Sequence, residues 1–371
     1  MSEGYVFSTA IDVNDLLNQV VGQAAAHGWT QHFLGGNGGN GRRGHISKDG
    51  CVVNLCSNIA SNVQNGGTVN LNEVIPSAAR DSALSYQWND GYSSRFQPDV
   101  LCINAGTAYN GSLPWYGQPG ADCKSDAQPD IARFRMIRAK GAIGSVHMFF
   151  FENPAAFIVI AEVRAGEFYW LSAGNLLKDY DFPGGQFYGA SLADHELQSG
   201  YPVAAEGFQL RCAHAKAVPG RGNSWGGFVS SPNRAVAPTQ DIPSGQRVPG
   251  PFTRTSGSST PNSNNVDQVQ RGYSPTTGRL WATSPRVYVD RAGGGKSYLG
   301  LLPHFHFIST MSFVGGEEAS VGGVIYSTFP WNFRVSPYDW DATTFGSANA
   351  NQSAMRRNNT LGSGWMIRKP M

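Results

Sequence analysis

The hydrophobic positions of the chain are densest between residues 145 and 189, where three apolar runs follow one another closely. The runs cover residues 145–151, 156–163 and 167–173, and only Glu-Asn-Pro and Arg-Ala-Gly segments separate them. Connectors this short are typical of β-hairpins. The pattern therefore predicts an antiparallel three-stranded meander, followed by a Pro-Gly-Gly corner, at the centre of the larger domain.

The middle run carries apolar residues on both of its faces. Side chains alternate between the two faces of a strand, which places Phe157, Val159 and Ala161 on one face and Ile158 and Ile160 on the other. A strand of this kind needs cover on both sides. We therefore expect the rest of the chain to pack over the meander.

One amphipathic helix is predicted near the N-terminus. Apolar residues recur there at helical spacing, at Val13, Leu16, Leu17, Val20, Val21, Ala24 and Ala25. Asp12 is placed to cap the first amide groups, and Gly28 ends the helix. Strand patterns follow at 29–34, 45–48 and 51–56, and Asp49-Gly50 between the last two is a hairpin signal. We expect a helix laid on a small sheet.

These patterns together predict a mainly β protein of the α+β type. It would consist of a small N-terminal helix-on-sheet module and a larger antiparallel β-sandwich or barrel-like domain with a long Gly/Pro/Ser-rich arm. The 371 residues divide into the N-terminal module with long loops (1–130), the meander (131–221), the extended arm or linker (222–284), and C-terminal strands with a polar tail (285–371). The content of 46 Gly and 21 Pro favours turns and loops over long helices.

The chain is poor in charge, with 15% charged residues and a formal net charge of +2, so no nucleic-acid specificity is expected. Its five cysteines are irregularly spaced and are interpreted as reduced, buried thiols. No run approaches the ~20 apolar residues of a membrane span, so no membrane insertion is expected. The N-terminus has acidic residues where a signal peptide has Lys or Arg, which favours synthesis in a cytosol.

Two glycine-rich segments resemble nucleotide-binding loops only in their letters. Residues 36–41 fit a dinucleotide fingerprint, but a strand follows them where the fingerprint requires a helix. Residues 293–297 end like a phosphate-binding loop, yet Asp290 stands where the first Gly belongs and Pro303 interrupts the helix that should follow. Both are interpreted as surface or hairpin loops, and no cofactor is expected.

Three histidines raise the question of a metal site. His304 and His306 share one face of a predicted strand, and His147 on another strand is a third candidate ligand. No Cys, Asp or Glu stands beside them at ligand spacing. We therefore interpret them as structural histidines.

Paired carboxylates occur twice, at Asp179 and Asp181 and at Asp339 and Asp341, both in turns rich in Tyr and Trp. A glycosidase needs two carboxylates that flank a cleft. Acids two residues apart in a turn are also commonly solvated, and both interpretations stay open. No serine-nucleophile motif stands at a strand-to-helix turn, and we expect no enzyme activity.

Aromatic residues are abundant outside the predicted strands as well as within them. Trp and Tyr anchor protein interfaces more often than most residues do. Those in the Gly/Pro-rich loop at 105–129, in the arm and in the C-terminal part are interpreted as interface candidates, namely Trp115, Tyr116, Trp225, Phe228, Phe252, Tyr273, Trp281, Trp331, Trp340 and Trp365.

Several short segments of the chain carry distinctive motifs, namely Gly28-Trp29, residues 45–55, Gln118-Pro119-Gly120, residues 169–178, Gly184-Gly185-Gln186-Phe187 and residues 323–330. Together these motifs resemble structural proteins of tailed-bacteriophage virions. The arm at 220–284 has no counterpart in that pattern. The resemblance implies a component of the neck, tail or baseplate region that is built as a symmetric ring or sleeve, and it brings no catalytic residues with it.

The sequence thus predicts a virion subunit, made in the host cytoplasm, that associates with itself and with other phage head–tail or tail proteins through aromatic loops and the arm. A carbohydrate-binding or polysaccharide-cleaving tail protein, which would use the loop aromatics and the Asp pairs, is the alternative. A receptor-binding fibre tip is a weaker one, because the chain lacks the repeats and coiled coil that many fibres show.

Overall fold

The computed structural model describes residues 3–37, 39–59, 99–125, 128–139, 141–164, 166–193, 209–214, 225–226, 228–230, 282–290, 296–309, 314–330 and 363–370. Antiparallel strands dominate these residues, which also contain one α-helix. The predicted mainly β fold with a helix on a sheet near the N-terminus is confirmed.

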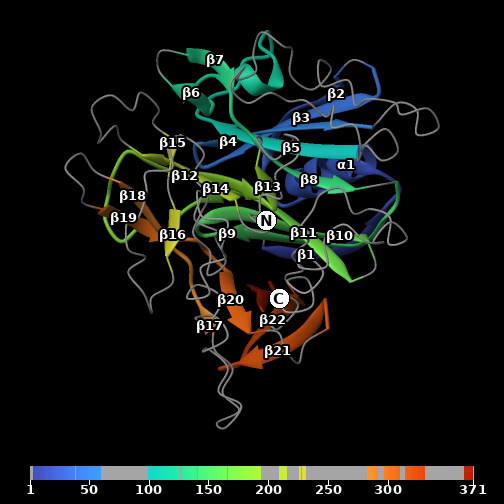
Figure 1. Ribbon diagram of the computed structural model, residues 1–371, viewed down its shortest axis with the longest axis vertical. Coiled ribbons are helices and arrows are strands. Elements are labelled where there is room, and N and C mark those ends of the chain that lie inside the picture. The colour runs from blue at the N-terminus through green and yellow to red at the C-terminus, as the bar shows by residue number, and fades with distance from the viewer. Residues whose placement is uncertain are drawn as a thin grey trace, which may run out of the picture.

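A seven-stranded sheet, here called the central sheet, forms the middle of the molecule (Figure 1). Its strands, in spatial order, are β1 (Gly4–Ala10), β9 (Ile143–Glu152), β10 (Ala155–Arg164), β11 (Glu167–Asn175), β12 (Gly184–Ala190), β14 (Gln209–His214) and β15 (Trp225–Gly226). Strands β9, β10 and β11 are joined by short turns, which confirms the predicted meander.

A six-stranded sheet lies on one side of the central sheet, with the helix between them at one end (Figure 1). We call it the upper sheet. Its order is β13 (Leu192–Ala193), β8 (Arg135–Ala139), β5 (Asp99–Gly106), β4 (Cys51–Asn58), β3 (Gly41–Lys48) and β2 (Thr30–Gly36). The hairpin of β3 and β4 turns at Asp49-Gly50, as the sequence predicts, with positive φ at both residues.

Helix α1 (Val13–Ala26) begins and ends where its sequence signals indicate. The Asp12 side chain accepts a hydrogen bond from the Asp15 amide at 2.8 Å, and Gly28 has a φ of 83° just past the helix. The apolar stripe is fully buried, at Val13, Leu16, Leu17, Val20, Val21 and Ala24. Because that stripe fills the space between the two sheets, packing as well as local propensity fixes the helix.

The C-terminal strands cover the opposite face of the central sheet. A five-stranded sheet, the lower sheet, has the order β17 (Ala282–Thr283), β20 (Phe305–Ser309), β23 (Ser363–Arg368), β22 (Val324–Pro330) and β21 (Glu317–Val321). Smaller sheets are formed by β16 (Phe228–Ser230), β18 (Arg286–Asp290) and β19 (Lys296–Leu301), and by β6 (Cys123–Ser125) with β7 (Gln128–Ala132).

Two hydrophobic cores result from this three-layer arrangement. The upper core receives Phe157, Val159 and Ala161 of β10, whereas Ile158 and Ile160 enter the lower core. The predicted alternation of β10 is therefore confirmed, and each face of the central sheet has its own covering layer.

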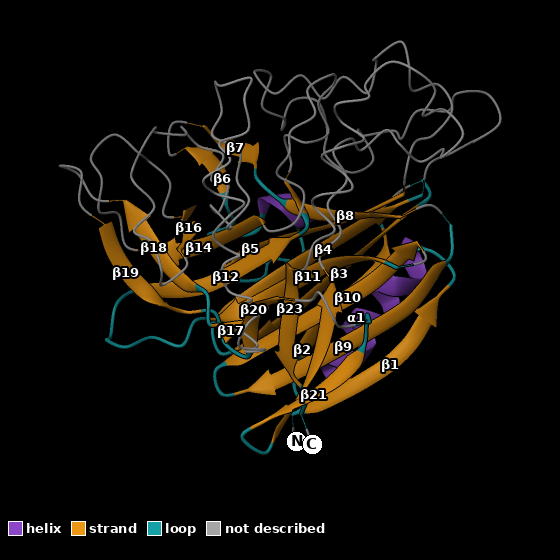
Figure 2. Cartoon of the chain, turned by 60° about the horizontal axis from the view of Figure 1, so that its bottom comes forward, coloured by secondary structure: helices purple, strands orange, loops and turns teal. Residues whose placement is uncertain are grey.

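The predicted segments 1–130 and 131–221 contribute strands to the same two sheets. Strand β1 pairs with β9 of the meander, and β8 pairs with β5 in the upper sheet. The upper core likewise contains residues from both segments. Strands far apart in sequence can pair in one sheet. The local sequence pattern around residue 130 carries no signal of such long-range pairing. The N- and C-terminal ends lie close together (Figure 2). Glu3 and Arg368 form an ion pair there.

Candidate functional site

Two of the predicted interface residues are core residues. Trp115 is 1% exposed in the upper core, where its ring meets Phe134 at a centroid distance of 6.0 Å, and Trp365 is fully buried in the lower core against Phe305. Their place in the sequence beside Pro and Gly indicated a surface loop. The prediction is corrected for both, because a buried side chain offers no surface to a partner.

The other interface candidates are placed only in part. Tyr116 is half-buried and packs against the upper core. The backbones of Trp225 and Phe228 belong to β15 and β16, which pair with β14 and β18. Two short segments within the predicted arm, Trp225–Gly226 and Phe228–Ser230, therefore belong to sheets. The remaining candidates lie outside the described residues, namely Phe252, Tyr273, Trp281, Trp331 and Trp340.

The Gly/Pro-rich loop around Trp115 is closed by its own hydrogen bonds. Trp115 begins a single 3-10 turn, η2 (Trp115–Gly117), and Gln118 next to it is 3% exposed. The Gln118 side-chain oxygen accepts from the Asn110 amide at 2.7 Å, and its Nε2 donates to the carbonyls of Asn110, Leu113 and Pro114. One buried amide thus satisfies much of the backbone of this loop.

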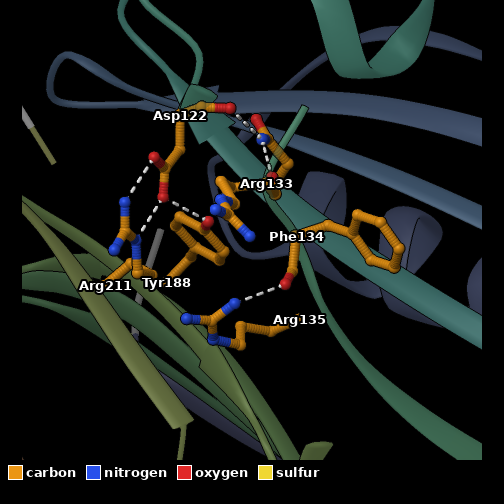
Figure 3. A network of polar contacts seen from close by, with 7 residues as sticks. Asp122, Arg133, Phe134, Arg135, Tyr188 and Arg211 are labelled. Atoms are coloured by element: carbon orange, nitrogen blue, oxygen red, sulfur yellow. Dashed lines mark hydrogen bonds and ion pairs between the residues drawn. The ribbon is translucent and has the colours of Figure 1, made fainter. Parts of the chain in front are cut away.

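A buried ion pair ties the end of the same loop to the central sheet (Figure 3). Asp122 is fully buried, and its carboxylate accepts hydrogen bonds from Arg211 on β14 and from the Tyr188 hydroxyl on β12, the latter at 2.6 Å. Burial, followed by the Asp122 charge, raises the pKa of Tyr188 well above its usual value. Asn104 of β5 donates to the carbonyls of Asp122 and Arg133. The cluster joins the two large sheets and has no access to a substrate.

A second buried polar row crosses the upper sheet. His45 on β3 stands opposite Asn54 on β4, which stands opposite Asn104 on β5. His45 Nδ1 lies 2.8 Å from Asn54 Oδ1. Burial, rather than a neighbouring charge, is the main cause that lowers the pKa of His45 to about 4. The row supports the sheet with satisfied polar contacts.

The exposed apolar side chains of the described residues differ from the predicted interface candidates, which were aromatic residues outside the predicted strands. The most exposed are Ile11 at 76%, Val314 at 74% and Phe7 at 61%. The complete set, here called the apolar rim, is Phe7, Ile11, Leu177, Tyr180, Val314, Val321 and Val324. Its members are mostly aliphatic or lie within a strand. For Phe7, the alternation of Tyr5, Phe7 and Thr9 is a sequence signal of a strand that could have identified it.

His147 marks a junction between the two ends of the chain and the central sheet. Its Nδ1 lies 2.8 Å from the Tyr5 hydroxyl, and its ring meets Phe7 at 5.0 Å and Phe329 at 4.8 Å. Burial lowers the pKa of His147 to about 4, against the opposing effect of the Glu162 charge, with Lys369 as a further lowering cause. At neutral pH the uncharged His147 side chain on β9 therefore contacts both β1 and β22.

His304 has a similar setting at the other side of this junction. Its ring stacks on Phe151 at 4.0 Å, and its Nδ1 accepts a hydrogen bond from Arg368 Nε at 3.1 Å. Burial first, and the Arg368 charge second, lower its pKa to about 4. His306 lies 3.0 Å from the Ser284 hydroxyl through its Nδ1. In the described part of the chain, no group of three potential ligands gathers as a metal site requires.

The remaining chemical candidates take ordinary structural places. Of the first Gly-rich motif, Gly36 ends β2 and Gly41 begins β3. Of the second, the described residues Lys296 and Ser297 begin β19. Asp181 is fully exposed, 3.8 Å from Lys178 Nζ, and Asp339 and Asp341 lie outside the described residues. An open groove of about 600 Å³ beside the start of α1 is lined by side chains of both charge signs, among them Asp12, Asp15 and Arg42.

No protein-family model matches the chain, and a search of curated proteins also finds no match. Within the described residues, no helix combines the length and the apolar character needed to cross a bilayer.

Proposed function

We propose that the chain is a structural subunit of a tailed-bacteriophage virion, placed in the neck, tail or baseplate region. In this proposal the protein is made in the host cytoplasm, associates with copies of itself into a ring or sleeve, and contacts other head–tail or tail proteins without catalysing a reaction. The resemblance of its short segments to such proteins motivates the proposal. The observation that carries it is the apolar rim.

The apolar rim is suited to contacts between proteins because its side chains project from well-anchored elements. Phe7 stands on β1, and Val321 and Val324 flank the Gly322-Gly323 tip of the hairpin formed by β21 and β22. Behind these positions lie two packed cores and the buried pair of Asp122 and Arg211. Contiguous exposed apolar side chains are a usual feature of surfaces that become buried on assembly, and Val321 and Val324 stand directly opposite each other in this hairpin.

The arm supplies the sharpest experiment. Because Trp225–Gly226, Phe228–Ser230 and Ala282–Thr283 are paired in sheets, the deletion should remove only residues 231–280, with a flexible Gly/Ser linker in their place. We expect this variant to unfold at the same urea concentration as the full chain but to be absent from purified particles. The readout is mass spectrometry of gradient-purified particles made with the rest of the encoding genome.

A scrambled arm of identical composition and length is the matched control, and it should also fail to enter particles. The proposal is wrong if the unaltered chain is absent from the particles. The role of the arm is wrong if the deletion variant is incorporated normally.

The alternative function, carbohydrate binding or cleavage by a tail protein, has one supporting observation. Tyr180 is 47% exposed and packs against Phe182 at a ring distance of 5.4 Å, with the exposed Asp181 between them in sequence. Exposed aromatic rings beside carboxylates are typical of sugar-binding surfaces. Loss of polysaccharide binding or cleavage in Tyr180→Ala, Asp179→Asn or Asp339→Asn, with unchanged stability, would favour this function.

A further inference from the structure

Strand β1 is an edge of the central sheet, and its first five residues, Gly4 to Ser8, lack the usual protection against pairing. Among the described residues, no strand lies on its outer side. An edge strand directs alternate backbone N–H and C=O groups outward, and natural edges are usually protected by charges, Pro or bulges. The residues Gly4–Ala10 contain neither charge nor Pro. The edge strand β21, in contrast, begins with Glu317 and Glu318.

The part of β1 that is free to pair is well defined. Helix α1 binds the C-terminal end of the strand, since Gln19 Nε2 donates to the Thr9 carbonyl at 2.8 Å and the Ile11 amide donates to Asp15 at 3.0 Å. The pairing of β1 with β9 is also irregular between Ser8 and Ala10. These contacts leave residues 4–8 as the regular segment. The edge strand β2 of the upper sheet has a register shift after Gln31 and ends in two glycines, which makes regular pairing there less favourable.

We propose that this edge is occupied by the same strand of a second copy of the chain, running antiparallel about a two-fold axis at Val6. Phe7 then stands opposite Tyr5 of the second copy, and the reverse pair forms at the same time. Directly opposite side chains on neighbouring strands are about 5 Å apart at Cβ, so the pairing covers the ring of Phe7, which is 61% exposed in the single chain. Two central sheets join into one.

The charges at the two ends of β1 fit this arrangement. Asp12 and Asp15 lie just beyond its C-terminal end. At its N-terminal end Arg368 is bound to Glu3, and Lys369, which lies 4.3 Å over the Tyr5 ring, is bound to Glu318. An antiparallel partner therefore brings the acidic end of one copy toward an end of the other whose charges are balanced, so two acidic ends do not meet. The strand itself places no like charges opposite one another, and a two-fold contact of this kind is self-complementary.

This contact does not depend on the virion proposal. It predicts a dimer of the purified chain, whereas the virion proposal is tested by the presence of the chain in particles. Either result therefore stands without the other.

The test is sedimentation velocity of the full-length purified chain over a concentration series, together with amide hydrogen exchange of the peptide that contains residues 4–8. We expect a concentration-dependent dimer, with exchange of this peptide slowed on dimerisation. Phe7→Lys should raise the dimer dissociation constant by about tenfold or more, because two aromatic cross-strand pairs are lost. Phe7→Thr, which keeps a good strand former, should have a smaller effect in the same direction.

Gln31→Lys is the matched control, since it places the same charge on an exposed strand position outside the apolar rim and should leave the dimer unchanged. The inference is overturned by a chain that remains monomeric throughout the series. It is also overturned by a dimer that Phe7→Lys and Phe7→Thr leave intact, or by one that shows equal exchange of residues 4–8 in the monomer and the dimer.

Discussion

Arg211 on the central sheet holds Asp122 on the upper-sheet loop, with Arg211 Nη2 2.7 Å from Asp122 Oδ1 and both side chains buried. Tyr188 donates to the same carboxylate, so Asp122 accepts from two strands of the central sheet. Removing one partner of a buried pair leaves the other charge without compensation, which costs more than the pair itself contributes. The contact thus fixes how the two sheets meet.

We expect Asp122→Ala to lower the free energy of unfolding by about 3–5 kcal/mol, measured by urea denaturation. Asp181→Ala removes an exposed carboxylate and should change that energy by less than about 0.5 kcal/mol. A small effect of Asp122→Ala would show that the ion pair does not organise the sheets.

Trp115 provides a direct test of its assignment to the core. Because its side chain is 1% exposed, Trp115→Ala should lower the free energy of unfolding by about 3–5 kcal/mol. Intrinsic fluorescence and urea denaturation measure the change. The original interface interpretation would be restored if the variant kept its stability and lost only self-association.

The pKa values of His45, His147 and His304, each lowered to about 4, predict an acid-sensitive fold. In the unfolded chain these groups titrate near 6.5, so the unfolded state binds more protons between the two values. Stability is therefore fully present above about pH 6.5 and falls as the pH decreases toward 4. Between pH 7.5 and 5 the expected loss is on the order of 1–2 kcal/mol for each histidine.

Urea denaturation at several pH values checks this dependence. The double substitution His147→Gln and His304→Gln should flatten the slope between pH 7.5 and 5. His32→Gln alters an exposed histidine and serves as the control. An unchanged slope in the double variant would assign the pH dependence to other groups.

Alanine substitutions at two glycines distinguish the gain in helix propensity from the cost of steric overlap. A Cβ at Gly22, on the exposed face of α1, meets no atom within 4 Å, so Gly22→Ala should raise the free energy of unfolding by about 0.5–1 kcal/mol. A Cβ at Gly44 would lie 2.6 Å from Val21 Cγ2 and 3.3 Å from Leu17 Cδ2. Gly44→Ala should therefore lower that energy by about 1–3 kcal/mol. Thermal unfolding of the two variants measures both effects.

Local patterns predicted the elements whose signals are local. The helix at Val13–Ala26, the Asp49-Gly50 hairpin and the meander all depend on residues close in sequence, and each was predicted near its observed bounds. The burial of Trp115 depends instead on Phe134 and on the upper sheet, which no short pattern contains. The same holds for Trp365, whose neighbour Phe305 lies far away in sequence.

The candidate surface was predicted less well for a related reason. Phe7 is not identified from the sequence because the short strand at Gly4–Ala10 is stabilised by pairing with β9, which lies more than a hundred residues away. Val314, Val321 and Val324 are aliphatic residues in a hairpin and its approach, and only their exposure distinguishes them from core residues. Asp122 likewise looks like an ordinary loop acid until Arg211 and Tyr188 are brought beside it.

The division of β10 between two cores has a consequence for biosynthesis. Ile158 and Ile160 need the lower layer, and that layer includes Trp365 and Ile367, which are synthesised long after β10. The second core therefore cannot close until these late strands exist, and a product that stops before them would present a bare apolar sheet to the chaperones and proteases of the cell.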